Sequence, residues 1–572
     1  MNSKKTFLIL YGILLLALLL RIFGINWDEG SHLHPDERAI VLSVLSLHFP
    51  ATLAEFLTPT SSWNPHFFAY GNFPFYLLRF VGDFVGIFDK QYAGYDGIQL
   101  VGRFLSTLFD LGTITMLFLL GKNLKNTITG LIAAFLYTVS TLPIQLSHFY
   151  AVDTPLTFFT TTILYLLLRF YEKPTGKKAL LLGISFGFAI ATKISAAVIL
   201  VTIGLTMCLD FFLIFIRRPH KISHWGPHFP LFFRRLFQGV SLIALSSIVT
   251  YLILSPYTFI DSGRFFQQTE EQSRMTKDAF TFPYTFQYAL KIPYLHELKN
   301  IFLFGIGPII GTLSLIGSVI FVYQAMTSTT KKDAAKHGIL LTFFIIYTII
   351  VGGFAVGFMR YMLPVYPLLC LFGAITIHKL FSEFIPRRSP LFALSSLLFT
   401  ALLLIWPLSF LHIYEKKHTR IAASEWIHQH IPAGKTIALE HWDDGLPLSG
   451  IEKYTVLTYP LYEPDTDEKW SLMQENLTKT DYIILGSNRL YTPLQKLTDC
   501  EKLPENRCYV RTTLYYRSLF NGLLGFEKVA EFASYPTVPL LGWKINDQGA
   551  DESFTVYDHP KIMIFKKQTQ EL

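Results

Sequence analysis

Long apolar runs separated by short polar connections make up the first 411 residues of the chain. A helix needs roughly 20 apolar residues to cross a bilayer. Runs of about that length lie near residues 6–25, 99–121, 128–147, 152–171, 179–193, 195–216, 237–256, 301–323, 338–358, 361–380 and 390–411. The stretch 179–216 is too long for one crossing, so we expect it to form two. The pattern predicts an α-helical polytopic membrane protein with about 11 transmembrane helices.

Basic residues concentrate in alternate connections between these runs. Cytoplasmic connections of membrane proteins carry an excess of Lys and Arg, so Lys4 and Lys5 place the N-terminus in the cytoplasm. The further cytoplasmic connections are then residues 122–126, 172–178, 217–235, 331–336 and the stretch with Arg387 and Arg388, all of them basic. This topology predicts a transmembrane domain over residues 1–411 in the cell membrane, with outer loops at 26–98 and 257–300.

The pattern changes after residue 412. A helical pattern at residues 421–430 is followed by strand-like runs such as KTIALE (435–440), DYIILGS (481–487), FTVYDH (554–559) and KIMIFKK (561–567). We therefore predict an extracytoplasmic α/β domain over residues 412–572. Cys500 and Cys508 lie close together there, and an oxidising compartment favours a disulfide between them. In the first outer loop, residues 67–88 are expected to form an amphipathic interfacial helix or, as an alternative, a further span.

Composition supports a membrane protein and argues against a nucleic-acid partner. The chain is 51% hydrophobic and 16% charged, with a mean hydropathy of +0.38. Its net charge is +8. Nucleic-acid binding requires basic residues gathered on one face, whereas here they follow the connections between apolar runs.

The first outer loop begins with an acidic segment, NWDEGSHLHPDER, directly behind an apolar run. Its chemistry-bearing residues are Asp28, Glu29, His34, Asp36 and Glu37. A carboxylate at the low-dielectric boundary can have its pKa raised, which suits a general base acting on an acceptor hydroxyl. Asp36 and Glu37 form the first candidate pair for that base, and Asp28 and Glu29 offer a second pair. A solvated loop or a helix cap is the structural alternative for both pairs.

Further charged residues are expected at the same membrane face. Asp153, in HFYAVDTPLTFF, begins a predicted span, where it can act catalytically or cap the helix. Lys193 and Arg360 lie at the outer ends of their spans, where a positive-inside protein avoids basic residues unless they bind an anion such as phosphate. Pro364 and Pro367 follow Arg360 and predict a bent or broken helix there. Arg264, in the second outer loop, is an additional phosphate-binding candidate.

Carboxylates facing cations fit glycosyl transfer from a lipid phosphate sugar. A divalent cation could assist, with Glu37, Asp28 or His34 as ligands. The alternative class is a transporter or flippase of a lipid-linked sugar, which predicts ionisable residues near the middle of the membrane.

The acidic segment with HPDE, and also YAVDTPLTFF, ATK (191–193), RYMLPVYP (360–367) and EHWDDGLPL (440–448), resemble the bacterial relatives of the dolichyl-phosphate-mannose protein mannosyltransferases, family 39 of the GT-C class. The resemblance implies the GT-C fold, a polyprenyl phosphate sugar donor and inversion at the anomeric carbon. It implies that Asp36, with Glu37 beside it, is catalytic, that Asp153 positions the base or the acceptor, and that Lys193 and Arg360 hold the phosphate. Related lipid A aminoarabinose transferases share this membrane core, so a protein and a lipid or glycan hydroxyl both remain possible acceptors.

Overall fold

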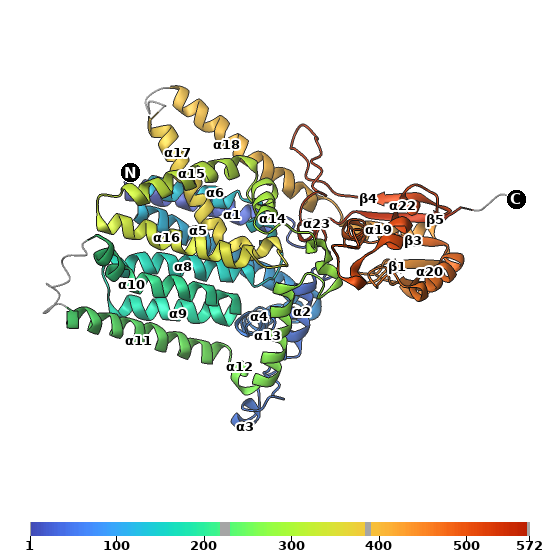
Figure 1. Cartoon of the computed structure of the whole chain (residues 1–572), viewed down its shortest axis with the longest axis horizontal. Helices are drawn as coiled ribbons and strands as arrows, with labels where there is room; N and C mark the ends of the chain where they lie inside the picture. Colours follow the sequence, from blue (N-terminus) through green and yellow to red (C-terminus); the bar gives the residue numbers. More distant parts are fainter. Residues whose placement is uncertain (1, 218–228, 384–389, 569–572) are drawn as a thin grey trace.

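Helices occupy every apolar run marked in the sequence, but the run 128–147 is divided into two shorter helices that are bent by 60° against each other (Figure 1). The computed structural model describes residues 2–217, 229–383 and 390–568. The helices are α1 (Ser3–Ile22), α5 (Tyr95–Leu124), α6 (Thr127–Thr138), α7 (Thr141–Ser147), α8 (Asp153–Glu172), α9 (Gly176–Thr192), α10 (Ile199–Arg217), α11 (Phe229–Leu254), α15 (Pro308–Thr327), α16 (Lys331–Gly352), α17 (Tyr366–Glu383) and α18 (Pro390–Leu411). As predicted, the stretch 179–216 divides, with the 3₁₀ segment η2 (Ile194–Val198) between α9 and α10.

Within the described ranges, seven helices are long and apolar enough to cross a membrane, or eight if the bent pair α6 and α7 forms one span, which is fewer than the roughly 11 predicted. The chain is therefore a multi-pass membrane protein. Three of the basic connections meet at one end of the bundle, because Lys336 donates to the carbonyl of Asn123 (2.9 Å) and pairs with Glu172 (2.6 Å). The connection 217–235 and the pair Arg387 and Arg388 lie in or beside segments outside the described residues.

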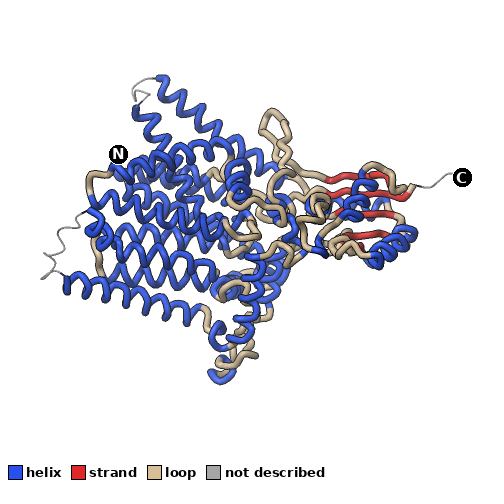
Figure 2. The backbone as a smooth tube through the Cα atoms, in the orientation of Figure 1, coloured by secondary structure: helices blue, strands red, loops and turns tan. Residues whose placement is uncertain are grey.

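The segments predicted as outer loops form short helices at the opposite end of the bundle, next to the C-terminal domain (Figures 1 and 2). They are α2 (Pro35–Leu45), α3 (Leu53–Phe56), α4 (Phe73–Gly86), η1 (Lys90–Ala93), α12 (Tyr257–Ile260), α13 (Ser262–Lys277), η4 (Pro283–Tyr288), α14 (Leu295–Asn300) and η5 (Ile301–Gly305). The 14 residues of α4 reach only about 21 Å at 1.5 Å per residue. Because the hydrocarbon core is about 30 Å thick, α4 is not a further span.

A five-stranded sheet with the order β2-β1-β3-β5-β4 forms the centre of the described C-terminal region. Its elements are α19 (Thr419–His430), β1 (Thr436–Glu440), β2 (Thr455–Tyr459), α20 (Asp467–Lys479), β3 (Tyr482–Leu485), α21 (Tyr491–Leu494), α22 (Val510–Phe520), β4 (Phe526–Phe532), α23 (Glu552–Thr555) and β5 (Ile562–Lys567). β1 runs parallel to β2 and β3, while β5 is antiparallel to β3 and β4.

Side chains alternate between the two faces of this sheet, as the period of a strand requires. Ile437, Ile484 and Ile564 pack on α19. Ala438, Ile483 and Phe565 pack on the other face with residues of α20 and α22. The predicted α/β domain is therefore present, and Cys500 and Cys508 form the predicted disulfide.

The strand predicted at residues 554–559 is wrong. Asp551 accepts a hydrogen bond from the amide of Ser553 (2.9 Å) and so starts α23 in that region. Beyond α23, Asp558 accepts hydrogen bonds from Gln145 of α7 (2.9 Å) and from Tyr414 (2.8 Å). Tertiary contacts with the helix bundle thus override the β propensity of this apolar run.

Close packing of α15 on α17 depends on Gly317, because a Cβ atom there would lie 1.9 Å from the carbonyl oxygen of Phe372. We expect Gly317→Ala to lower the free energy of unfolding by about 1–3 kcal/mol, the usual cost of overpacking. Gly338 of α16 has open space at the same position, so Gly338→Ala should leave stability unchanged or raise it slightly. Thermal unfolding in detergent compares the two variants, and equal melting temperatures would contradict this account of the contact.

Candidate active site

Arg103 of α5 holds the acidic segment of the first outer loop. Its guanidinium donates to both oxygens of Asp28 (3.0 and 2.8 Å) and to both oxygens of Glu37 (3.0 and 2.6 Å). The Glu37 carboxylate also accepts a hydrogen bond from the amide of Tyr150 (2.8 Å). All three charged side chains are fully buried. The loop is therefore fixed at both ends of its acidic segment.

Asp36 points away from this cluster. Consecutive helical residues project about 100° apart, since a helix has 3.6 residues per turn. Glu37 is turned to Arg103, and Asp36 therefore faces a different side of α2. There its Oδ2 lies 2.7 Å from Nη1 of Arg360. The clamp on Glu37 thus sets the direction of Asp36.

Two aspartates and two cations alternate in one continuous cluster. Arg360 also approaches Asp153, with its Nε 3.7 Å from Oδ2, and Lys193 donates to Oδ1 of Asp153 over 2.9 Å. The Lys193 ammonium lies 4.5 Å from the ring centre of Tyr361, and the Arg360 guanidinium 4.8 Å from that of Phe358. Carboxylates and aromatic faces therefore replace water around both cations.

Breaks in regular helices place both cations in this cluster. Arg360 lies on the 3₁₀ segment η6 (Met359–Val365), which contains Pro364 and precedes α17, as the prolines predict. Lys193 is the extended residue that ends α9. The first outer loop reaches the same point, because the amide of Gly71 donates to the carbonyl of Thr192 (3.1 Å) and a Cβ atom at Gly71 would collide with Ala191.

A cavity of about 630 Å³ opens beside the cluster. Its lining includes Asp36, Lys193, Arg360, Tyr70 and Tyr361 from the membrane part. The C-terminal domain closes the other side with Arg420, Trp442, Asp443, Asp444, Arg489 and Tyr557. The cavity is thus a shared surface of the membrane part and the sheet-containing domain.

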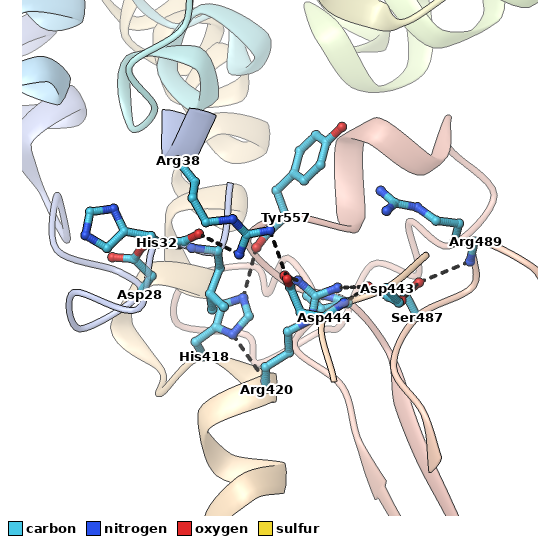
Figure 3. A network of polar contacts seen from close by, with 12 residues as sticks. Asp28, His32, Arg38, His418, Arg420, Asp443, Asp444, Ser487, Arg489 and Tyr557 are labelled. Atoms are coloured by element: carbon cyan, nitrogen blue, oxygen red, sulfur yellow. Dashed lines mark hydrogen bonds and ion pairs between the residues drawn. The ribbon is translucent and has the colours of Figure 1, made fainter. Parts of the chain in front are cut away.

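Figure 3 shows the polar contacts that join these two surfaces. Arg38 of α2 pairs with Asp444 (3.0 Å), and Arg420 pairs with Asp444 (3.0 Å) and with Asp443. Arg489 donates to the carbonyl of Trp442 (3.0 Å) and pairs with Glu552 (2.7 Å). These contacts connect the helix that carries Asp36 with the segment that carries Trp442.

Electrostatics at Asp36 differ from the expectation of a raised pKa. Burial alone would raise the pKa of Asp36, but Arg360 and, to a smaller extent, Lys193 lower it below its ordinary value. Burial also lowers the pKa of His34 to about 3. The site therefore holds an ionised Asp36 beside a neutral imidazole.

The structure brings Asp36, Asp153, Lys193 and Arg360 together and leaves the other predicted residues apart. Glu37 and Asp28 are held by Arg103 outside the cavity lining, so Asp28 does not compete with Asp36 at this cavity. Glu29 is exposed, and Arg264 is a half-exposed residue near Asp261 (3.8 Å). Asp153 turns its carboxylate to Lys193 and Arg360 rather than capping α8.

The three residues named as metal ligands are engaged in other contacts. The oxygens of Asp28 and Glu37 are occupied by Arg103, and Nδ1 of His34 accepts the amide of Glu37 (3.3 Å). Among the described residues, no group of three or more His, Cys, Asp or Glu is arranged to hold a metal ion.

Several residues of the site were not predicted from the sequence. Arg103 lies inside an apolar run counted as a span, although a charged residue in a span is itself a functional signal. Arg38, Arg420 and Arg489 look like ordinary surface arginines in sequence. Asp443 and Asp444 belong to the EHWDDGLPL segment, but only the fold brings them to Arg38, about 400 residues earlier in the chain.

Replacing Arg103 tests whether its ion pairs with Asp28 and Glu37 hold the first outer loop. Arg103→Gln leaves the carboxylates of Asp28 and Glu37 buried without their cation, and we expect a loss of about 3–5 kcal/mol in the free energy of unfolding. Arg264→Gln, at a half-exposed position, should change it by less than about 0.5 kcal/mol. Thermal unfolding of both variants in detergent is the measurement, and a stable Arg103→Gln protein would show that the loop is held by other contacts.

Comparisons with known proteins agree with the fold. Residues 96–254 match the family described as dolichyl-phosphate-mannose-protein mannosyltransferase. No curated protein sequence matches the chain significantly. The structure is similar to the oligosaccharyltransferase AglB of Archaeoglobus fulgidus in complex with an inhibitory peptide and a dolichol-phosphate, with 14% identity over 99% of this chain and 89% of that chain and a TM-score of 0.50.

Two further solved structures are similar at lower scores. ArnT of Cupriavidus metallidurans bound to undecaprenyl phosphate shares 11% identity over 86% of this chain and 95% of that chain, with a TM-score of 0.43. The Pmt1–Pmt2 protein O-mannosyltransferase complex of S. cerevisiae bound to the sugar donor shares 16% identity over 51% of this chain and 37% of that chain, with a TM-score of 0.33. The chain has the fold of the GT-C membrane glycosyltransferases, as its sequence motifs predict.

Proposed function

We propose that this protein is an inverting membrane glycosyltransferase that moves a sugar from a polyprenyl phosphate donor to a hydroxyl group of a protein, lipid or glycan acceptor. The observation that carries the proposal is the cluster of Asp36, Arg360, Asp153 and Lys193 at the side of one large cavity. It combines a carboxylate base with two cations suited to a phosphate leaving group.

Asp36 acts as the general base in this proposal. The acceptor oxygen attacks the anomeric carbon, its proton passes to Asp36, and the bond between that carbon and the phosphate oxygen breaks. The sugar is inverted because attack and departure occur on opposite faces. Polyprenyl phosphate leaves with the bonding electrons.

Arg360 and Lys193 stabilise the phosphate as its negative charge grows. Arg360 is paired with Asp36 in the free protein, so an incoming donor phosphate competes with Asp36 for this cation. That competition weakens the interaction that depresses the pKa of Asp36 and makes the carboxylate a stronger base when the donor is bound. Asp153 keeps both cations in position through its contacts with Arg360 and Lys193.

The match of residues 96–254 to a family named for a dolichyl phosphate sugar donor supports this donor class. The disulfide between Cys500 and Cys508 supports an extracytoplasmic location for the C-terminal domain. With the N-terminus in the cytoplasm, the reaction then takes place at the outer membrane face. Mannose is the first sugar to test.

The distribution of charge argues against a transporter or flippase. Residues of α2 and α13 line the cavity, and Figure 1 shows these two helices at the end of the bundle next to the sheet-containing domain rather than near its middle. One buried ion pair, Arg21 with Asp110, lies within the bundle, but Tyr137 also donates to Asp110 (2.8 Å) and the group is sealed from solvent. We interpret this pair as a structural contact between α1 and α5.

The first test replaces Asp36 with Asn. Loss of the base should reduce transfer by about 10²–10⁴-fold while the protein stays folded. The assay incubates the full-length protein with a panel of radiolabelled polyprenyl phosphate sugars and measures the release of polyprenyl phosphate. Asp83→Asn is the matched control, because Asp83 is an outer-loop aspartate paired with Arg79 on α4. A fully active Asp36→Asn protein would refute the assignment, and donor movement across the bilayer without phosphate release would support the flippase.

The second test uses pH. Because Arg360 and Lys193 lower the pKa of Asp36 against the effect of burial, Arg360→Gln should raise that pKa. The acid limb of the kcat/KM profile, which reports the free enzyme, should then move to higher pH. Lys193→Gln should move it in the same direction by less.

Arg38→Gln provides the control for the pH experiment. Arg38 lines the same cavity but pairs with Asp444, so its removal should leave the position of the acid limb unchanged. An acid limb that stays in place in Arg360→Gln would show that Asp36 is not the base.

A further inference from the structure

A hairpin of the C-terminal domain, residues 536–545, projects away from the sheet beside the end of α18 (Figure 1). It presents apolar side chains to its surroundings. Leu540 is fully exposed, Trp543 is 67% exposed and Leu541 57% exposed. Such a concentration of large apolar residues at one tip marks an interaction site rather than a surface in water.

The hairpin has a defined backbone. Thr537 and Lys544 form an antiparallel bridge, and the amide of Val538 donates to the carbonyl of Trp543 (2.8 Å). The amide of Gly542 donates to the carbonyl of Val538 (3.0 Å) and closes the turn. The apolar side chains are therefore held outward by a formed turn.

The base of the hairpin contacts the end of a membrane helix. The amide of Thr537 donates to the carbonyl of Ser409 (2.9 Å), two residues before α18 ends at Leu411. The same helix exposes Leu402, Ile405 and Leu408 on its outer side, and it belongs to a segment long and apolar enough to cross a membrane. The apolar tip thus begins where the lipid-facing stripe of α18 ends, which is the boundary between membrane and water.

We propose that hairpin 536–545 inserts its tip into the interface of the leaflet on the side of the C-terminal domain. Trp prefers the headgroup level, where its ring is half buried, and the Lys544 ammonium can reach lipid phosphates. Leu540 and Leu541 enter the acyl chain boundary. The partner is the lipid bilayer, and the contact is independent of the donor and the acceptor.

This contact fixes the C-terminal domain relative to the membrane surface at a point away from the cavity. The hairpin base continues to Asp547, which accepts a hydrogen bond from His559 (2.8 Å) in the buried segment after α23. The tip is therefore joined to the segment that contains Tyr557, a residue of the cavity lining.

Fluorescence quenching tests the proposal. The full-length protein is placed in vesicles with and without phospholipids brominated near the headgroup end of the acyl chain. The chain has eight tryptophans, so the contribution of Trp543 is the difference between the wild type and Trp543→Phe. We expect the brominated lipid to quench most of this difference.

A matched control places the tryptophan at an exposed leucine elsewhere in the C-terminal domain. Leu523 is 80% exposed and precedes β4 at the end of the sheet where Phe526 pairs with Lys567, the last residue of β5. Figure 1 shows β5 running toward the C-terminus, away from α18. In the double variant Trp543→Phe with Leu523→Trp, the added emission should not be quenched. An unquenched Trp543 would overturn the proposal, and so would Trp543 emission that depends on the density of protein in the membrane, which indicates contact with a second copy.

Discussion

Neutralisation of Asp28 and Glu37 by Arg103 is the interaction on which the candidate site depends. A buried carboxylate without a cation is strongly destabilising, and here one guanidinium serves two. The contact ties the loop after α1 and the start of α2 to α5, so that only one of the two adjacent acids on α2 can be bound. Glu37 takes the structural position, and the helical geometry then directs Asp36 toward Arg360.

Charge balance explains why the second cluster suits a phosphate leaving group. Asp36 and Asp153 carry two negative charges, and Lys193 and Arg360 carry two positive charges. A polyprenyl phosphate sugar adds one negative charge as a phosphodiester. In the proposed transfer, Asp36 loses its charge on accepting the proton while the departing phosphate gains one. The total is unchanged, so little solvent reorganisation is needed, and Arg360 exchanges one anionic partner for another.

The sequence predicts the parts of this protein that local chemistry controls. Apolar length locates most of the long helices, because a membrane helix must bury its own backbone polar groups, but it does not show the break that divides residues 128–147 into α6 and α7. The alternation in KTIALE and KIMIFKK is enough for β1 and β5. FTVYDH fails because Asp558 is bound by Gln145 and Tyr414, which lie in other parts of the chain. Such contacts leave no trace in a short window of sequence.

Some residues of the candidate site can likewise be identified from the sequence, and others only from the fold. Asp36, Asp153, Lys193 and Arg360 stand out because each is a charge at the end of an apolar run. Arg264 carries the same charge, but it lies in a polar helix near Asp261 and lacks that context. The sequence does not separate Asp36 from Glu37 or Asp28, because that distinction depends on Arg103, which approaches them only in the fold. The lowered pKa of Asp36 has the same origin, since it reflects a residue more than 300 positions away.

Contacts between residues far apart in the sequence also hold the C-terminal domain against the membrane part at the cavity. His559 lies between Asp558 and Asp547, and these two carboxylates raise its pKa to about 10 although burial alone would lower it. The charged imidazole therefore joins the hairpin base to the segment bound by α7.

At the cavity, Arg38 and Arg420 both pair with Asp444. The His559 contacts lie outside the cavity lining and the Asp444 contacts belong to it, so two separate contacts hold the domain that carries Trp442 against the membrane part that carries Asp36. These contacts keep a space of defined size between Asp36 on the membrane part and the surface of the C-terminal domain, and the proposed transfer requires such a space for its donor and acceptor.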